Sequence, residues 1–312
     1  MRIDRLISLN LVRPLRRAFD MDHASGTTTL PVLMYHSISD DSEPGSHPYY
    51  RVCTSPQRFR DQMQWLKNND YRAVGLSAGL AWLNSPHGSN VTRHIAITFD
   101  DGFSDFYTHA FPILRQSGFS ATMYLSTAFI GQSRRSFRPS TINPQLSTGR
   151  ECLTWAEVRE LHRTGIEFGS HTVHHPELVD LSWSDIQTEI QTSKAQIETE
   201  IGDLVRAFAY PYSFPQARPD FVGRFKDLLM AAGYETCVTT QIGRHRPDAD
   251  LMQIKRLPVN SGDDVRLLQA KLEGGYDWLA LPQLFSKSVR RHFSSSRHFF
   301  PKINGRDIEQ IP

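Results

Sequence analysis

The sequence predicts an α/β protein built around a parallel sheet of about seven strands. From residue 30 onward, short apolar segments alternate with longer amphipathic segments, which is typical of successive βα units. Of the 312 residues, 39% are hydrophobic and 22% are charged, as in ordinary globular proteins. No internal repeat of fixed period occurs, so solenoid and propeller folds are not expected.

The expected strands are apolar segments of four to seven residues, a usual strand length. They span 30–36, 95–99, 120–125, 166–169, 207–210, 235–239 and 253–257. The expected helices span 56–68, 105–116, 155–163, 184–201 and 220–232. Pro56 suits a first helical turn, with Thr54 or Ser55 as the cap, and Gly118 suits the end of the second helix. Residues 131–150, rich in Ser, Arg, Pro and Thr, read as a surface insertion.

The composition also excludes several classes of protein. Thirty-five Lys and Arg balance 33 Asp and Glu, and the net charge of +2 gives no reason to expect a nucleic-acid partner. The apolar segments are far shorter than the ~20 residues of a membrane span, and we expect no secretory signal. Three widely spaced cysteines predict neither a disulfide framework nor a thiolate zinc site. Reduced thiols suit a cytoplasmic protein.

Polar residues that directly follow apolar strands are the candidates for chemistry, because reacting groups gather at strand ends in parallel α/β folds. Asp100 and Asp101 end one such strand, before Gly102. Adjacent carboxylates disfavour each other's ionisation, so a metal or a proton-transfer role explains the pair, while an ordinary Asp-Gly turn is the alternative. His171 and His175 follow another strand, and imidazoles four residues apart can converge on one metal.

The segment that follows residues 207–210 is the third candidate. Pro211 fixes the backbone there, and the turn is suited to aim the Tyr212 amide at a developing oxyanion. The alternative is a rigid turn with packed tyrosines.

Together, these three segments resemble the motifs of the carbohydrate esterase family 4 polysaccharide deacetylases, which share the nodulation-factor deacetylase homology domain. The motifs occur in the family's order as TFDDG, HTVHH and YPYS, framed by PVLMYHSI, QMQWLKNNDYRAV, FPILRQSGFSATMYL, LTWAEVREL and IEFGSHTVHHPEL. The resemblance covers residues 30–260 and implies a single distorted (β/α)7 barrel. It also implies metal-assisted removal of acetyl groups from N-acetylglucosamine in chitin-like, peptidoglycan or exopolysaccharide chains.

The resemblance assigns roles residue by residue. Asp101, His171 and His175 correspond to the metal ligands and Asp100 to the general base. Zinc is the expected cofactor, with cobalt, nickel or manganese as alternatives. Three protein ligands leave positions open for water and substrate, as a catalytic zinc site requires.

The sequence departs from the family pattern in two places. Ala209 stands where many members have an arginine that orients the base, and 257–259 reads Leu-Pro-Val where the family has a Leu-x-His that supplies the general acid. The chain also resembles the poly-N-acetylglucosamine deacetylases, which look like permuted members. That resemblance suggests His36 as the acid and Arg256 as the substitute arginine.

Three parts are expected: a basic N-terminal tail (1–29), the deacetylase barrel (30–260) and a C-terminal extension (261–312). Basic residues interleave with apolar ones at both ends, and Pro14 is expected to break or kink any N-terminal helix. The ends predict either peripheral contact with an anionic cytoplasmic membrane surface, within reach of a lipid-linked glycan, or solvated tails. Two further functions stay open: deformylation or other amide hydrolysis, and an inactive glycan-binding protein.

Overall fold

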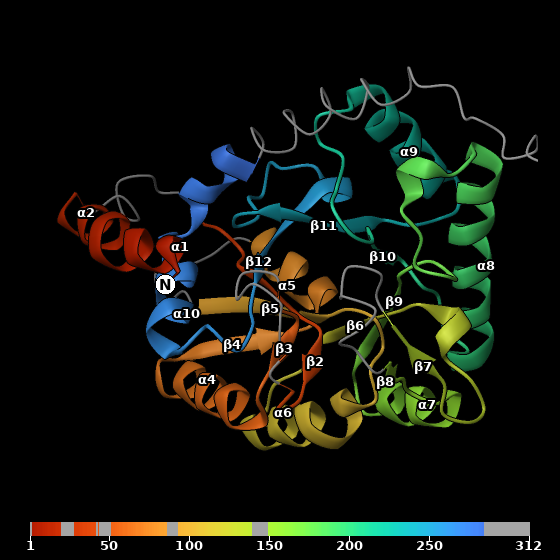
Figure 1. Ribbon diagram of the computed structural model, residues 1–312, viewed down its shortest axis with the longest axis horizontal. Helices are drawn as coiled ribbons and strands as arrows, with labels where there is room; N and C mark the ends of the chain where they lie inside the picture. Colours follow the sequence, from red (N-terminus) through yellow and green to blue (C-terminus); the bar gives the residue numbers. More distant parts are fainter. Residues whose placement is uncertain are drawn as a thin grey trace, which may run out of the picture.

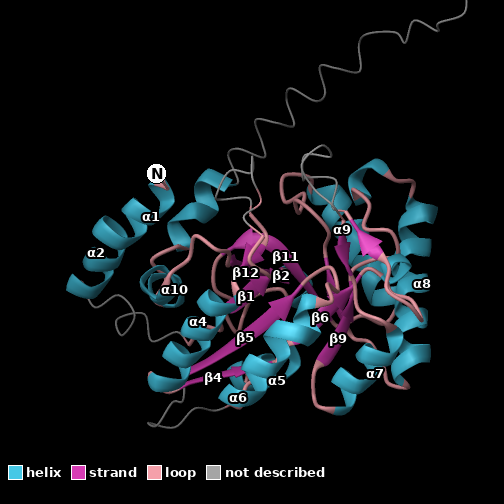
Figure 2. Cartoon of the chain, turned by 60° about the horizontal axis from the view of Figure 1, so that its bottom comes forward, coloured by secondary structure: helices cyan, strands magenta, loops and turns pink. Residues whose placement is uncertain are grey.

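The computed structural model describes residues 2–19, 28–41, 43, 51–85, 93–138 and 149–283. Its centre is a closed barrel of parallel strands with helices around the outside (Figure 1; Figure 2). The order around the barrel is β1 (Val32–Tyr35), β12 (Ile254–Pro258), β11 (Thr236–Ile242), β10 (Ala207–Ala209), β9 (Glu167–Ser170), β6 (Thr122–Leu125) and β5 (Arg93–Phe99). Pairing of Val32 with Ala96 joins β5 back to β1. The predicted single (β/α)7 barrel is confirmed.

Alternate residues along each strand separate the outer core from the barrel interior. Leu33, Tyr35 and Phe99 belong to the large cluster that also contains the buried faces of the helices. Val32 and Ala96, at alternate positions of the same strands, belong to a second buried cluster that fills the interior. Because side chains alternate in direction along a strand, residues in register with the second cluster also face the inside of the barrel.

A strand and the helix that follows it are among the elements that the sequence analysis did not predict, as are the N-terminal helices and the helix after the barrel. β4 (Tyr71–Val74) pairs with the first half of β5, and the Ser120 N–H donates to the Ala73 carbonyl, so β4 lies between β5 and the start of β6. The helix α5 (Leu76–Leu83) follows it. A Cβ at Gly79 would lie 3.1 Å from a Leu30 methyl, so a glycine there lets α5 pack closely against the interior cluster.

The five predicted helices are present. α4 (Pro56–Asn68) starts at Ser55, whose hydroxyl accepts the Arg58 N–H, and α7 (Trp155–Arg163) starts with a Thr154 and Glu157 capping box. The others are α8 (Trp183–Ile201), α9 (Pro219–Ala231) and a helix that begins as the π-helical turn η2 (Phe106–Ala110) and continues as α6 (Phe111–Ser117).

The shorter elements lie in the connections. They are β2 (Ser37–Ile38), β3 (Cys53–Thr54), β7 (Ser136–Phe137), β8 (Arg150–Glu151), and the 3-10 turns η3 (Thr127–Phe129), η4 (Leu178–Asp180), η5 (Leu251–Gln253) and η6 (Asp277–Leu279). Of the predicted insertion 131–150, residues 139–148 lie outside the described residues. Its two ends form the antiparallel pair β7 and β8.

The N-terminal segment corrects the expectation about Pro14. α1 (Ile3–Ile7), the π-helical turn η1 (Ser8–Val12) and α2 (Arg13–Ala18) follow one another without a break. Proline lacks the N–H and its ring collides with the carbonyl four residues back, which normally breaks a helix. Here the preceding turn is wider, with the Arg13 N–H reaching the Ser8 carbonyl, and the helix continues through the proline.

These N-terminal helices lie beside α10 (Val265–Leu272) (Figure 1; Figure 2). Their arginines pair with acidic residues after the barrel: Arg2 with Asp263 (3.1 Å), Arg5 with Asp264 (2.6 Å) and Arg13 with Glu273 (2.8 Å). Much of the basic charge of residues 2–19 is therefore compensated within the protein. The basic residues at 287–302 lie outside the described residues, so membrane contact stays a prediction. None of the described helices has the length and apolar character needed to span a bilayer.

Candidate metal centre and active site

Four of the candidate residues meet at the carboxyl ends of the barrel strands. His36 follows β1, Asp100 follows β5, and His171 follows β9, while Arg256 lies within β12. Tyr35 pairs with Phe99, so the next residues along the two strands, His36 and Asp100, come together. The His36 Nε2 and Asp100 Oδ2 atoms are 3.9 Å apart.

Asp101, His171 and His175 form a compact group of possible metal ligands. Asp101 Oδ1 lies 3.6 Å from His171 Nε2 and 3.5 Å from His175 Nε2, and the two Nε2 atoms are 3.1 Å apart. Ligands of a tetrahedral zinc with bonds of ~2.1 Å are separated by about 3.4 Å. Among the residues that the structure describes, no other His, Cys, Asp or Glu side chains form such a group.

The chemistry of the three side chains also suits a cation. His171 Nδ1 lies 2.8 Å from the Ala209 carbonyl, which fixes the proton on Nδ1 and leaves the Nε2 lone pair toward Asp101. Asp101 Oδ1 is buried and has no hydrogen-bond partner. Burial and the neighbouring Asp100 raise the pKa of Asp101, while burial lowers the pKa of both histidines. A divalent cation would stabilise the ionised carboxylate and bind the neutral imidazoles, so these residues fit a metal.

Left-handed backbone conformations bring these side chains together. Asp101 (φ 75°), Thr172 (φ 68°), His175 (φ 54°) and Tyr212 (φ 54°) all have positive φ, which is rare for non-glycine residues and is concentrated at functional sites. Gly102 (φ 73°) follows Asp101, and a Cβ there would come within 2.9 Å of a Leu125 methyl. The backbone turn that directs Asp101 toward the histidines therefore requires glycine at position 102.

Arg256 holds Asp100 in a buried, bidentate ion pair. The two guanidinium Nη atoms lie 2.7 and 2.8 Å from the Asp100 oxygens, and the same guanidinium donates to Thr98 Oγ1 (3.2 Å) and to the Thr239 carbonyl (3.0 Å). Burial alone would raise the pKa of Asp100, but Arg256 overcomes this effect and holds that pKa well below its usual range. Asp100 is therefore ionised at neutral pH and its orientation is fixed.

His36 is neutral in the resting site. Its side chain is 20% exposed. Burial and the charge of Arg256 lower its pKa to about 4, although Asp100 acts in the opposite direction. If the imidazole donates a proton during a reaction at neutral pH, it has to receive that proton first.

Tyr212 and His174 occupy different places relative to the ligand group. The Tyr212 ring packs edge-on against the His175 ring, with centroids 4.4 Å apart. His174 points away, with a side chain that is 68% exposed and an Nδ1 atom 2.6 Å from Glu189 Oε1. The structure thus brings together the two outer histidines of the HTVHH segment and leaves the middle one on the surface.

Two residues at the site were missed by the sequence analysis. Thr98 bonds to Arg256 and to the Leu33 carbonyl, and a polar residue within an apolar strand was the signal that could have found it. Glu189 contacts the HTVHH segment from α8, whose many polar residues gave no reason to single it out.

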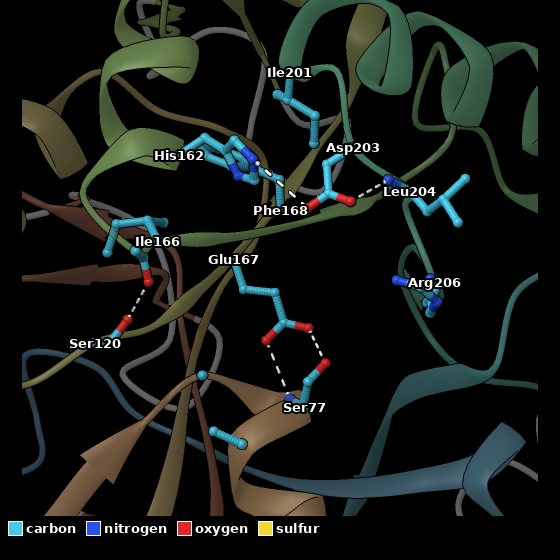
Figure 3. A pocket seen from close by; sticks show the side chains of 13 residues that line it. Ser77, Ser120, His162, Ile166, Glu167, Phe168, Ile201, Asp203, Leu204 and Arg206 are labelled. Carbon is cyan, nitrogen blue, oxygen red and sulfur yellow. Dashed lines mark hydrogen bonds and ion pairs between the residues drawn. The ribbon is translucent and has the colours of Figure 1, made fainter.

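A cavity of about 510 Å³ lies away from the candidate site (Figure 3). It is lined by residues at the starts of β9 and β10, whereas the candidate site lies at the strands' carboxyl ends. The Glu167 carboxylate within it accepts from Ser77 N (3.1 Å) and Thr122 Oγ1 (2.7 Å) (Figure 3 shows Glu167 facing Ser77). These hydrogen bonds join α5, β6 and β9, so we assign Glu167 and its partners a role in stabilising the fold.

Residues 87–226 match the family model described as polysaccharide deacetylase. The chain is 28% identical over 226 residues to the poly-beta-1,6-N-acetyl-D-glucosamine N-deacetylase of Staphylococcus epidermidis, covering 70% of this chain and 71% of that protein.

Two solved structures share the fold. The deacetylase PplD of Streptococcus pyogenes, solved in complex with acetate, matches with a TM-score of 0.63 and 23% identity over 79% of this chain and 99% of its own. IcaB from Ammonifex degensii matches with a TM-score of 0.61 and 22% identity over 79% of this chain and 97% of its own. At these identities the likeness shows the barrel fold.

Proposed function

Because the chain carries a polysaccharide deacetylase domain, we propose that it is a metal-dependent hydrolase of N-acetyl groups. Its substrate is an N-acetylglucosamine-type residue of a poly- or oligosaccharide or of its lipid-linked precursor. The observation that carries the proposal is the convergence of Asp101, His171 and His175 beside the Arg256-bound Asp100. The name of the Staphylococcus epidermidis relative supports a β-1,6-linked N-acetylglucosamine polymer as the substrate class.

The positions of these side chains support the following mechanism. A divalent cation held by Asp101, His171 and His175 supplies Lewis acidity toward the acetyl carbonyl when it is bound. Asp100 takes a proton from the attacking water, and Arg256 keeps Asp100 ionised and oriented for that step. The Tyr212 amide donates to the developing oxyanion. His36 delivers a proton to the leaving amine, with Asp100 3.9 Å away as the nearby proton source.

Removal of His36 tests the proton delivery. His36→Ala is expected to lower kcat by about 100-fold or more, the usual size of a general-acid contribution, while the metal content stays unchanged. Because the pKa of His36 is about 4, this imidazole does not titrate between pH 6 and 8. The shape of the kcat/KM profile in that range is therefore expected to be the same in His36→Ala and in the wild type. Steady-state acetate release and zinc analysis measure both effects. A variant with the wild-type kcat would show that His36 has no part in the reaction.

Removal of Arg256 tests the control of Asp100. Without the guanidinium, burial raises the pKa of Asp100, and the acid limb of kcat/KM is expected to move to higher pH by about 1–3 units in Arg256→Met. The fold is also expected to lose about 3–5 kcal/mol, since a buried carboxylate is left unpaired. The matched control is Arg206→Met, which removes a half-exposed arginine paired with Glu235. An unmoved acid limb in Arg256→Met would contradict the assignment.

The function itself is tested by product analysis. Purified protein with zinc is incubated with chitooligosaccharides, β-1,6-linked N-acetylglucosamine oligomers and undecaprenyl-linked N-acetylglucosamine, and acetate and free amine are measured. Equal amounts of both products from at least one glycan are expected. N-formylated sugars test the deformylase alternative. Glycan binding without any released acid would identify the protein as a binding module and refute the proposal.

A further inference from the structure

Glu189 on α8 holds the backbone of the segment that carries both histidine ligands. Its Oε2 atom accepts from two consecutive N–H groups, those of Val173 (2.8 Å) and His174 (2.9 Å). Its Oε1 atom lies 2.6 Å from His174 Nδ1. The Glu189 side chain is only 13% exposed.

These hydrogen bonds hold a segment of the backbone that is strained. Thr172 and His175 flank the two residues whose N–H groups donate to Glu189, and both have positive φ. The segment is also bound to the turn η3, where the Thr127 and Ala128 N–H groups donate to the Thr172 and Val173 carbonyls. The carbonyl groups of the segment are thus bound by η3, and two of its N–H groups are bound by a carboxylate from a helix.

We propose that Glu189 is a positioning residue for metal binding, an inference that rests on the proposed metal site at Asp101, His171 and His175. Glu189 touches none of the three ligand atoms. It fixes the turn between the histidines so that their Nε2 atoms face Asp101 before a cation arrives. Residues that orient metal ligands usually change metal affinity by about 10–100-fold when they are removed.

The test compares the zinc dissociation constants of variants at position 189, measured by competition with a chromophoric chelator. The variants distinguish the effect of the side chain's length from the effect of its charge. Glu189→Ala is expected to bind zinc about 10–100-fold more weakly. Glu189→Gln keeps an oxygen that can accept both N–H groups and is expected to stay near the wild-type affinity. Glu189→Asp keeps the charge but is one methylene shorter, and it is expected to behave like the alanine variant.

Two controls isolate the effect. His174→Ala removes only the exposed imidazole and is expected to retain wild-type zinc affinity. Glu200→Ala removes another carboxylate from α8, one that pairs with Arg159 at the surface, and is also expected to be neutral. Thermal unfolding of the metal-free variants shows whether each is folded. If Glu189→Ala does not fold, the Gln and Asp variants still decide between length and charge.

The outcomes separate this inference from the proposed function. Wild-type affinity in both Glu189→Ala and Glu189→Asp would overturn the positioning role while leaving the metal site intact. Retained affinity in Glu189→Asp with loss in Glu189→Gln would also overturn it, since charge rather than position would be responsible. A wild-type protein that binds zinc but releases no acetate would refute the proposed reaction and leave the Glu189 assignment standing.

Discussion

Replacement of His171 or His175 by alanine is expected to remove metal binding and acetate release together. Each imidazole supplies one of the three proposed ligand atoms, which lie within 4.8 Å of one another, and two ligands hold a cation far more weakly than three. Loss of a Lewis acid worth several kcal/mol predicts a fall in turnover on the order of 1,000-fold. Zinc content after gel filtration and the rate of acetate release measure the two effects.

His174→Ala is the matched control, because it removes a histidine from the same segment whose side chain is 68% exposed and faces Glu189. It is expected to retain one zinc per chain and most of the activity. If His171→Ala and His175→Ala both retained stoichiometric zinc, the ligand group would have to be placed elsewhere.

Asp100→Asn is expected to lower kcat by about 100-fold or more while zinc content stays near one per chain. The amide has nearly the shape of the carboxylate and can still accept from Arg256, but it cannot take a proton from water. The proposed metal ligand Asp101 is not altered. Because the substitution leaves the buried Arg256 without a counter-charge, circular dichroism has to show that the variant is folded at the assay temperature.

The control for this variant is Asp248→Asn, which changes an exposed aspartate paired with Arg246. It is expected to leave kcat unchanged. Full turnover in Asp100→Asn would assign the general base to another group.

The sequence could predict the barrel because each of its seven ring strands carries its own apolar signal, and a helix separates successive ring strands everywhere except between β11 and β12. β4 escaped because only Ala73 of its four side chains is fully buried, so Tyr71–Val74 lacks the continuous apolar signal of the ring strands. The N-terminal helix escaped for a different reason. A proline normally stops a helix, and only the wider turn at Ser8–Val12 lets this one continue.

The site was predictable in part for similar reasons. Asp100 and Asp101 are adjacent, and His171 and His175 are four residues apart, so local spacing already points to convergence. Arg256 and His36 approach Asp100 only because β12, β1 and β5 close the barrel, which local sequence patterns do not encode. Their roles came from the family resemblance. Neither local spacing nor the family resemblance pointed to Glu189, since a polar residue on a largely polar helix is ordinarily at the surface.

The central claim is that one divalent cation at Asp101, His171 and His175 is required for N-acetyl hydrolysis. The most direct measurement is acetate release from β-1,6-linked N-acetylglucosamine oligomers by chelator-stripped protein, titrated with zinc. Activity is predicted to start near zero, rise in proportion to added zinc and level off at one equivalent per chain. Full acetate release by the stripped protein, in the continued presence of chelator, would contradict the claim.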